Sequence, residues 1–220
     1  MSAHRRDKIP APVLVGVIAS IDELRLATRM REPPDLFELR LDHLPNLHES
    51  QLSGLRRPFI ITARHSAEGG KRCKRKSLLR KFLPYARFVD IELRSLRELR
   101  EIWAEARRLG VSRICSVHDF KRTPELSVLR KQFSRSRKAN ANVFKLVTRA
   151  DSLRDLLTLF EFLWTQSSRM PVCVMAVGKF GPISRVLFHE AGSVFIYAPL
   201  RHALYDGQLT LGQLRRSRDF

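Results

Sequence analysis

Eight short apolar runs of strand length alternate with helix-patterned segments along most of this chain, and that alternation restricts the folds it can adopt. Strict alternation is typical of a parallel sheet that is covered by helices. Eight such units predict an α/β fold of the (β/α)8, or TIM-barrel, type in a single domain. The expected strands cover residues 13–19, 35–42, 58–63, 88–93, 111–117, 142–147, 171–177 and 193–198.

Local signals place the helices between these runs. Ser20 followed by Glu23 forms a capping-box pattern for a helix over 20–30, and Ser95 is expected to cap a helix that Gly110 ends. The other helices are expected at 49–55, 71–81, from Pro124 onward, 152–166, 183–190 and from Leu209 onward. No GxGxxG or P-loop pattern follows the first expected strand, which weakens the alternative of an open, nucleotide-binding sheet.

The chain is expected to consist of an N-terminal extension, residues 1–12, and one domain over residues 13–220. The extension lacks the apolar segment of a signal peptide, and the longest apolar runs, of six to eight residues, are too short to cross a bilayer. We therefore expect a cytoplasmic protein without a membrane partner. The three cysteines include no CxxC pair, so neither a disulfide framework nor a zinc site is indicated.

The charge balance is strongly basic, with 41 Lys and Arg against 22 Asp and Glu and a formal net charge of +19. Such a balance attracts nucleic acids, anionic membranes or anionic substrates, and the charge alone does not indicate which of these the protein binds. The most basic run is Lys71-Arg72-Cys73-Lys74-Arg75-Lys76. We interpret it as the solvated face of an outer helix, because no aromatic residues are interleaved with it for base stacking. Nucleic-acid binding stays open as a disfavoured alternative.

Polar residues interrupt five of the expected strands on one alternating face. Parallel strands that are covered on both sides normally read as nearly continuous apolar runs. Because the C-terminal ends of barrel strands are where active sites are built, we expect these side chains to meet there in an ionic network. The alternative, the solvated face of an antiparallel sheet, conflicts with the intervening helices. The ten residues are Glu38, Arg40, Asp42, Thr62, Arg64, Asp90, Glu92, Ser116, His118 and Lys145.

The strand at 142–147 carries a single lysine. Strand side chains alternate between faces, so Phe144 and Leu146 point one way while Lys145 points the other. If both faces are covered, burial and neighbouring cations would leave part of Lys145 as a free amine at neutral pH, which makes it a candidate Schiff-base former. Taken alone, the segment also fits an edge strand whose lysine lies in solvent.

Several short motifs follow one another in a fixed order over residues 13–211. They are Glu38-Leu39-Arg40-Leu41-Asp42, Thr62-Ala63-Arg64 with Glu68-Gly69-Gly70, Val89-Asp90-Ile91-Glu92-Leu93, Ser116-Val117-His118-Asp119-Phe120, Phe144-Lys145, Met175-Ala176-Val177-Gly178 with Ser184-Arg185, and Gly207-Gln208. In their order and approximate spacing the sequence resembles the type I 3-dehydroquinate dehydratases. These are TIM-barrel hydro-lyases of the shikimate pathway, which leads to chorismate and the aromatic amino acids. Each motif is weak alone, and together they are specific.

The resemblance implies the chemistry of the site. Lys145 would form an imine with the C3 ketone of 3-dehydroquinate, and His118 would remove the C2 proton and then protonate the departing C1 hydroxyl. Glu68 would orient His118. The resemblance implies no metal or organic cofactor, and it implies a homodimer. The substrate-binding residues carried over from the family are Glu38, Arg40, Arg64, Arg185 for the substrate carboxylate, and Gln208 in the last loop.

One position departs from the family pattern. The family usually has a serine four residues before the final glutamine, and here that position is Leu204. One hydrogen bond to the substrate is therefore expected to be missing. Asp90 and Glu92 are expected to form structural salt bridges, and Met175 is expected to pack against the substrate ring. Another Schiff-base barrel enzyme, such as a class I aldolase, remains an alternative that would use the same lysine.

Overall fold

The computed structural model describes residues 13–68, 70–71, 73–203 and 205–216. The expected N-terminal extension, residues 1–12, and Leu204 lie outside the described residues. Within those residues, no helix has both the length and the apolar content needed to cross a membrane.

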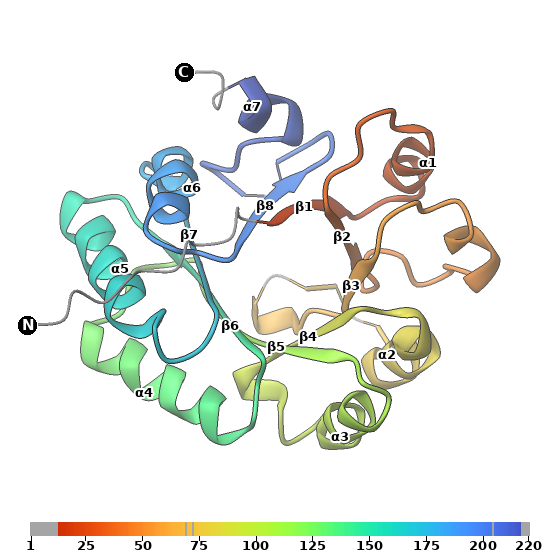
Figure 1. The fold of residues 1–220 in the computed structure, drawn as a ribbon, viewed down its shortest axis with the longest axis horizontal. Helices are drawn as coiled ribbons and strands as arrows, with labels where there is room; N and C mark the ends of the chain where they lie inside the picture. The colour runs from red at the N-terminus through yellow and green to blue at the C-terminus, as the bar shows by residue number, and fades with distance from the viewer. Residues whose placement is uncertain (1–12, 69, 72, 204, 217–220) are drawn as a thin grey trace, which may run out of the picture.

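Eight parallel strands form an inner ring with helices around it (Figure 1). Their order in the sheet is β7-β6-β5-β4-β3-β2-β1-β8, so β1 pairs with both β2 and β8. Between β7 and β8 the contact is looser: Val194 N donates to Val172 O at 3.0 Å, and Val174 N donates to Ser193 Oγ at 3.0 Å. The predicted (β/α)8 barrel is thus confirmed in nearly closed form. The strands are β1 (Val13–Ile18), β2 (Leu36–Arg40), β3 (Phe59–Thr62), β4 (Phe88–Glu92), β5 (Ser112–Asp119), β6 (Val143–Arg149), β7 (Val172–Val177) and β8 (Phe195–Pro199).

The helices lie outside the strand ring (Figure 1). The α-helices are α1 (Ile21–Arg29), α2 (Arg75–Phe82), α3 (Arg100–Arg108), α4 (Leu126–Lys138), α5 (Leu153–Gln166), α6 (Gly181–Glu190) and α7 (Leu211–Arg216). Short 3₁₀ helices complete several connections: η1 (Glu49–Leu52), η2 (Ser66–Glu68), η3 (Leu83–Tyr85) and η4 (Leu93–Ser95).

Two of the predicted helix-end signals act as expected. Ser20 Oγ accepts a hydrogen bond from Glu23 N at 3.2 Å, and Glu23 Oε2 accepts one from Ala19 N at 2.8 Å. Gly110 follows the last turn of α3 with φ of +71°, a conformation that glycine adopts without the strain of a Cβ atom.

The predicted cap at Ser95 is wrong. α3 begins only at Arg100, and residues 93–95 form the 3₁₀ helix η4. The reason lies in a distant partner, because Ser95 Oγ accepts a hydrogen bond from Arg75 Nη1 at 3.2 Å instead of capping a helix. α2 also begins later than expected, at Arg75, because the chain before it is held as a loop by Lys71 N donating to Asp42 Oδ2 at 3.2 Å.

The interior of the barrel is layered along the strands. Near their N-terminal ends, five strands place an apolar side chain inward: Leu36, Ile60, Phe88, Ile114 and Val143. Two residues further along, the same face carries polar side chains that are almost fully buried: Glu38, Thr62, Asp90, Ser116 and Lys145. The apolar layer closes the bottom of the barrel, so the charged layer above it is reached by water only from the C-terminal ends of the strands.

Candidate active site

A pocket opens at the C-terminal ends of the strands, and seven of the eight predicted site residues line it. The eighth, Glu68, lies behind His118 and contacts it. The full lining is Val17, Glu38, Arg40, Arg64, His118, Phe120, Lys145, Val147, Met175, Arg185, Tyr197, Pro199, Tyr205 and Gln208.

Lys145 lies at the centre of this pocket and is only 2% exposed. Its strand β6 pairs with β5 and β7, so the alternative of a solvent-facing edge lysine is wrong. Its Nζ lies 2.9 Å from Glu38 Oε1, 3.0 Å from Asp90 Oδ2 and 3.7 Å from the centroid of the Tyr197 ring. Both carboxylates therefore lie within hydrogen-bonding distance of the Lys145 nitrogen.

Arg64 shares these carboxylates with the lysine. Its Nη2 lies 3.4 Å from Asp90 Oδ2 and 3.9 Å from Glu38 Oε1. Burial raises the pKa of Asp90, but Lys145 and Arg64 outweigh burial and hold that pKa below its ordinary value. Asp90 therefore forms an ion pair as expected, but its partners belong to the site. The group of two cations and two carboxylates is close to neutral, which allows it to persist out of water.

His118 lies on the neighbouring strand, two positions beyond the residue that pairs with Lys145. Its Nδ1 is 2.8 Å from Glu68 Oε2, and Arg64 Nη1 lies 2.7 Å from its Nε2. Burial lowers the pKa of His118 well below its ordinary value, and the nearby cations Arg64, Lys145 and Arg40 lower it further. The imidazole is therefore neutral at neutral pH, as a general base must be.

Glu68 is the partner that orients this imidazole. Burial raises its pKa to about 7, with Glu92 adding to the rise and Arg64 opposing it. As a carboxylate, Glu68 accepts the Nδ1 proton of His118, which leaves Nε2 as the acceptor nitrogen; in this structure Nε2 is contacted by Arg64 Nη1, which must withdraw before Nε2 can take a proton. Histidine tautomers are fixed in this way by the hydrogen bond of the other ring nitrogen.

Arg40 is held against Asp42 by a two-pronged contact. Its Nε donates to Asp42 Oδ1 at 3.0 Å and its Nη2 donates to Oδ2 at 2.8 Å. Burial raises the pKa of Asp42, but the hydrogen bonds and charge of Arg40 outweigh burial and lower it overall. The guanidinium of Arg40 is thereby fixed at the rim of the pocket.

Arg185 reaches the pocket from α6 and is 3% exposed. Its Nη1 donates to the carbonyl oxygens of Ala176 at 2.9 Å and Gly181 at 2.6 Å. Among the described residues, no carboxylate lies within ion-pair distance of it, and its buried Nε has no hydrogen-bond partner. Burial lowers the pKa of Arg185 to about 10. A buried guanidinium without an acidic partner is suited to receive a carboxylate from a ligand.

The loop after β8 covers one side of the pocket. Tyr205 stacks on Phe120 with ring centroids 4.1 Å apart, and Gln208 Oε1 accepts a hydrogen bond from Tyr205 N at 3.1 Å. This loop is fastened to the loop after β7, since Gly178 N donates to Asp206 O at 2.9 Å. The departure at Leu204 falls outside the described residues.

Sequence reasoning missed three aromatic residues of the site: Phe120, Tyr197 and Tyr205. Tyr197 shares a face of β8 with Phe195 and alternates with Ile196, so the strand pattern could have placed it inside the barrel. Phe120 and Tyr205 come from loops that are far apart in the sequence, and no local pattern joins them. Met175 lines the pocket, and its packing against the substrate ring stays a prediction.

The described part of the chain gathers no group of three or more His, Cys, Asp or Glu side chains that could hold a metal ion.

Known proteins resemble this chain over nearly its whole length. Residues 15–219 match the family described as type I 3-dehydroquinase. The chain is 32% identical over 211 residues to a 3-dehydroquinate dehydratase of Methanocella arvoryzae, covering 92% of this chain and 94% of that protein. It is 33% identical over 231 residues to that of Methanosarcina barkeri, covering 96% and 94%.

Solved structures share the fold. The type I 3-dehydroquinate dehydratase of Clostridium difficile superposes with a TM-score of 0.83 at 21% identity, covering 94% of this chain and 90% of that one. The 3-dehydroquinate dehydratase of Aquifex aeolicus gives a TM-score of 0.81 at 24% identity, covering 94% and 97%. With the family match over nearly its whole length and relatives above 30% identity, this chain belongs to the type I 3-dehydroquinase family.

Proposed function

We propose that this protein is a hydro-lyase that removes water from 3-dehydroquinate to give 3-dehydroshikimate in the shikimate pathway, through an imine on Lys145. The observation that carries the proposal is a buried lysine in the same pocket as a neutral histidine and a guanidinium without an acidic partner. An imine needs the lysine, the proton transfers need the histidine, and the substrate carboxylate needs the guanidinium.

Imine formation begins with loss of a proton from the Lys145 ammonium. Glu38 and Asp90, at 2.9 and 3.0 Å from Nζ, are the available acceptors. The free amine then adds to the C3 ketone, and the carbinolamine loses water to give a protonated imine. That imine draws electrons from the C2–H bond, so a base of ordinary strength can remove the C2 proton.

His118 is the base for this step and then the acid for the next. Its Nε2 takes the C2 proton, and the imidazolium returns a proton to the C1 hydroxyl, which leaves as water while the C1–C2 double bond forms. Glu68, 2.8 Å from Nδ1, stabilises the imidazolium between the two transfers. Addition of water to the imine then releases the product and regenerates Lys145.

Substrate binding falls to the charged rim of the pocket. Arg185 pairs with the substrate carboxylate, and Gln208 closes over it from the last loop. Glu38, Arg40 and Arg64 bind hydroxyl groups. A substrate hydroxyl or ketone must also compete with the existing contact between Arg64 and Nε2 of His118.

The test is turnover of 3-dehydroquinate followed by the absorbance of the conjugated enone. The wild-type protein is expected to produce this absorbance, and Lys145→Ala is expected to abolish it. His118→Ala is expected to retain imine formation while turnover falls by about 10²–10⁴-fold, the usual worth of general acid–base catalysis. Cleavage of a carbon–carbon bond in place of water loss would instead indicate an aldolase.

We also propose a cytoplasmic homodimer, which the family resemblance supports. Light scattering is expected to give twice the chain mass, and a monomer would contradict this.

Binding to DNA with an affinity that falls steeply with salt would support the nucleic-acid alternative.

A further inference from the structure

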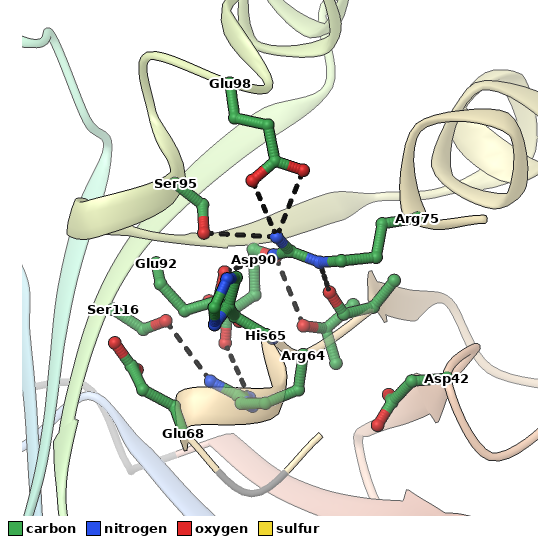
Figure 2. Close-up of polar contacts among 12 residues, drawn as sticks. Asp42, Arg64, His65, Glu68, Arg75, Asp90, Glu92, Ser95, Glu98 and Ser116 are labelled. Carbon is green, nitrogen blue, oxygen red and sulfur yellow. Dashed lines mark hydrogen bonds and ion pairs between the residues drawn. The ribbon is translucent and has the colours of Figure 1, made fainter. Parts of the chain in front are cut away.

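The side chain of Arg75 is only 10% exposed, although it lies in the most basic run of the sequence. Figure 2 shows its guanidinium turned toward Ser95 and Glu98 at the N-terminal side of α3, above the loop that carries Arg64 and Glu68. Its Nε donates to Ala63 O at 2.6 Å, at the end of β3, and its Nη2 pairs with Glu92 Oε2 at 2.5 Å. The sequence led us to expect that Arg75 lies on the solvated face of an outer helix, and this expectation is wrong for Arg75.

Glu92 uses its second oxygen to hold the turn that follows β3. Its Oε1 accepts a hydrogen bond from His65 N at 2.7 Å. The carbonyl oxygen of His65 in turn accepts from Glu68 N at 2.9 Å and Gly70 N at 3.1 Å. The backbone of η2, a single 3₁₀ turn, is therefore anchored to the barrel through His65 and Glu92.

The same turn carries the carboxylate that orients the general base. Glu68 is the last residue of η2, and its Oε2 lies 2.8 Å from Nδ1 of His118. A continuous path of hydrogen bonds therefore runs from Arg75 through Glu92, His65 and Glu68 to His118. Catalytic groups need placement to a fraction of an ångström, and a misplacement of 1 Å can cost about 10²-fold in rate.

We propose that Arg75 and Glu92 form a positioning pair that holds the η2 turn, and with it Glu68, in register with His118. The proposal rests on the function proposed above, since it assigns these residues to the proton-transfer half of that reaction. Neither residue lines the pocket, so each acts through Glu68 and not on the substrate.

The negative charge of Glu92 also affects the pKa of Glu68, and this effect can be measured. Glu68 faces His118 of β5, Arg64 after β3, Asp90 and Glu92 of β4, and Arg94 of η4. After burial, Glu92 is the largest cause of the raised pKa of Glu68. Removing the charge of Glu92 is therefore expected to lower the pKa of Glu68.

The experiment compares Glu92→Gln, Arg75→Ala and Arg75→Lys with two control variants. Arg80→Ala removes an arginine of the same helix, one that pairs with Glu101 and Glu105 on the outside. Glu98→Gln removes the half-exposed partner of Arg75 and leaves Glu92 in place. Wild-type turnover and its borohydride adduct on Lys145 are measured first, because they test the proposed function by itself.

Glu92→Gln and Arg75→Ala are expected to lower kcat by about 10²-fold with KM unchanged, since substrate binding is intact. Arg75→Lys is expected to recover part of the loss, and both controls are expected to stay near wild type. In Glu92→Gln the acid limb of the kcat/KM profile is expected to move to lower pH. All variants are expected to form the imine. If Arg75→Ala does not fold, the nearly isosteric Glu92→Gln carries the test.

A readout without turnover separates this proposal from the function. Nitrogen-15 NMR of the imidazoles, with His118→Asn for assignment, is expected to show one Nδ1–H tautomer in the wild type and a mixture in Glu92→Gln. An unchanged tautomer, kcat and pH profile in that variant would overturn the positioning role. A rise in the KM of Glu92→Gln by the same factor as the fall in its kcat would also overturn the positioning role. Absence of wild-type turnover and adduct would defeat the proposed function, while the tautomer measurement would still report on the link itself.

Discussion

At the scale of single residues, the site depends on how its buried charges are matched. Lys145 and Arg64 share Glu38 and Asp90, and all four side chains are almost inaccessible to water. Removing one member of a buried group leaves an uncompensated charge, which is costly because nothing else in the pocket can solvate it. The network is thus part of the proposed active site and also a place where a substitution would destabilise the fold.

Asp90→Asn is therefore expected to lower the free energy of unfolding by about 3–5 kcal/mol. Asp90 contacts both Lys145 and Arg64, so one substitution weakens two pairs. Urea unfolding measures the change. The control is Asp22→Asn, whose pair with Arg25 lies on the surface and is expected to contribute less than about 1 kcal/mol. Equal midpoints for the two variants would show that the buried network adds no stability.

The pH dependence follows from the Glu68 and His118 pair. The pKa of Glu68 is raised to about 7, whereas that of His118 is lowered, so the carboxyl is the first of the two to gain a proton as pH falls. Glu68 can accept the Nδ1 proton of His118 as a charged group only while its carboxylate is ionised. We expect kcat/KM to fall as pH drops below about 7. In Glu68→Gln this limb is expected to shift to lower pH, at a reduced rate; an unshifted limb would assign it to another group.

At the scale of elements, the last loop owes its position to a close backbone approach. Gly207 has φ of +73°, and a Cβ added there would lie 2.1 Å from the carbonyl oxygen of Gly178. The Gly207 carbonyl oxygen also accepts a hydrogen bond from Arg185 Nη1 at 3.3 Å. The loop that brings Gln208 to the pocket is thus packed directly on the loop after β7.

Gly207→Ala is expected to push these two loops apart and to raise KM, because Gln208 and Arg185 lose their positions together. Gly110→Ala is the matched control, since its φ of +71° is equally unfavourable for alanine but its Cβ would meet nothing within 4 Å. The control is expected to lose some stability and keep its KM. Steady-state kinetics of both variants measures KM. Equal KM values in the two variants would contradict the proposal that the contact between Gly207 and Gly178 positions Gln208 and Arg185.

The elements also show what the sequence could predict and why. The strands were predictable to within one or two residues at most ends, because buried apolar runs and their polar alternate faces are local patterns. The cap at Ser95 was not, because its hydroxyl is taken by an arginine 20 residues away. The contact of Asp90 with Lys145 and the stacking of Phe120 on Tyr205 likewise join distant segments, and their geometry exists only in the closed barrel.

At the scale of the whole molecule, the net charge of +19 is expected to attract an anionic substrate. A strongly charged protein steers oppositely charged ligands toward its surface, and salt screens that attraction over a Debye length of about 10 Å at 0.1 M ionic strength. We expect kcat/KM for 3-dehydroquinate to fall as ionic strength rises, while kcat stays constant. A kcat/KM that is independent of salt would show that the charge has no part in substrate capture.

The proposed reaction depends on a lysine, enclosed by the strand ring, that captures the ketone of the substrate. The most direct measurement is mass spectrometry of the protein after borohydride reduction in the presence of 3-dehydroquinate, with proteolysis to locate the modified residue. We expect one covalent adduct per chain, on Lys145, and no adduct in Lys145→Ala. An adduct on another lysine, or turnover without any adduct, would contradict it.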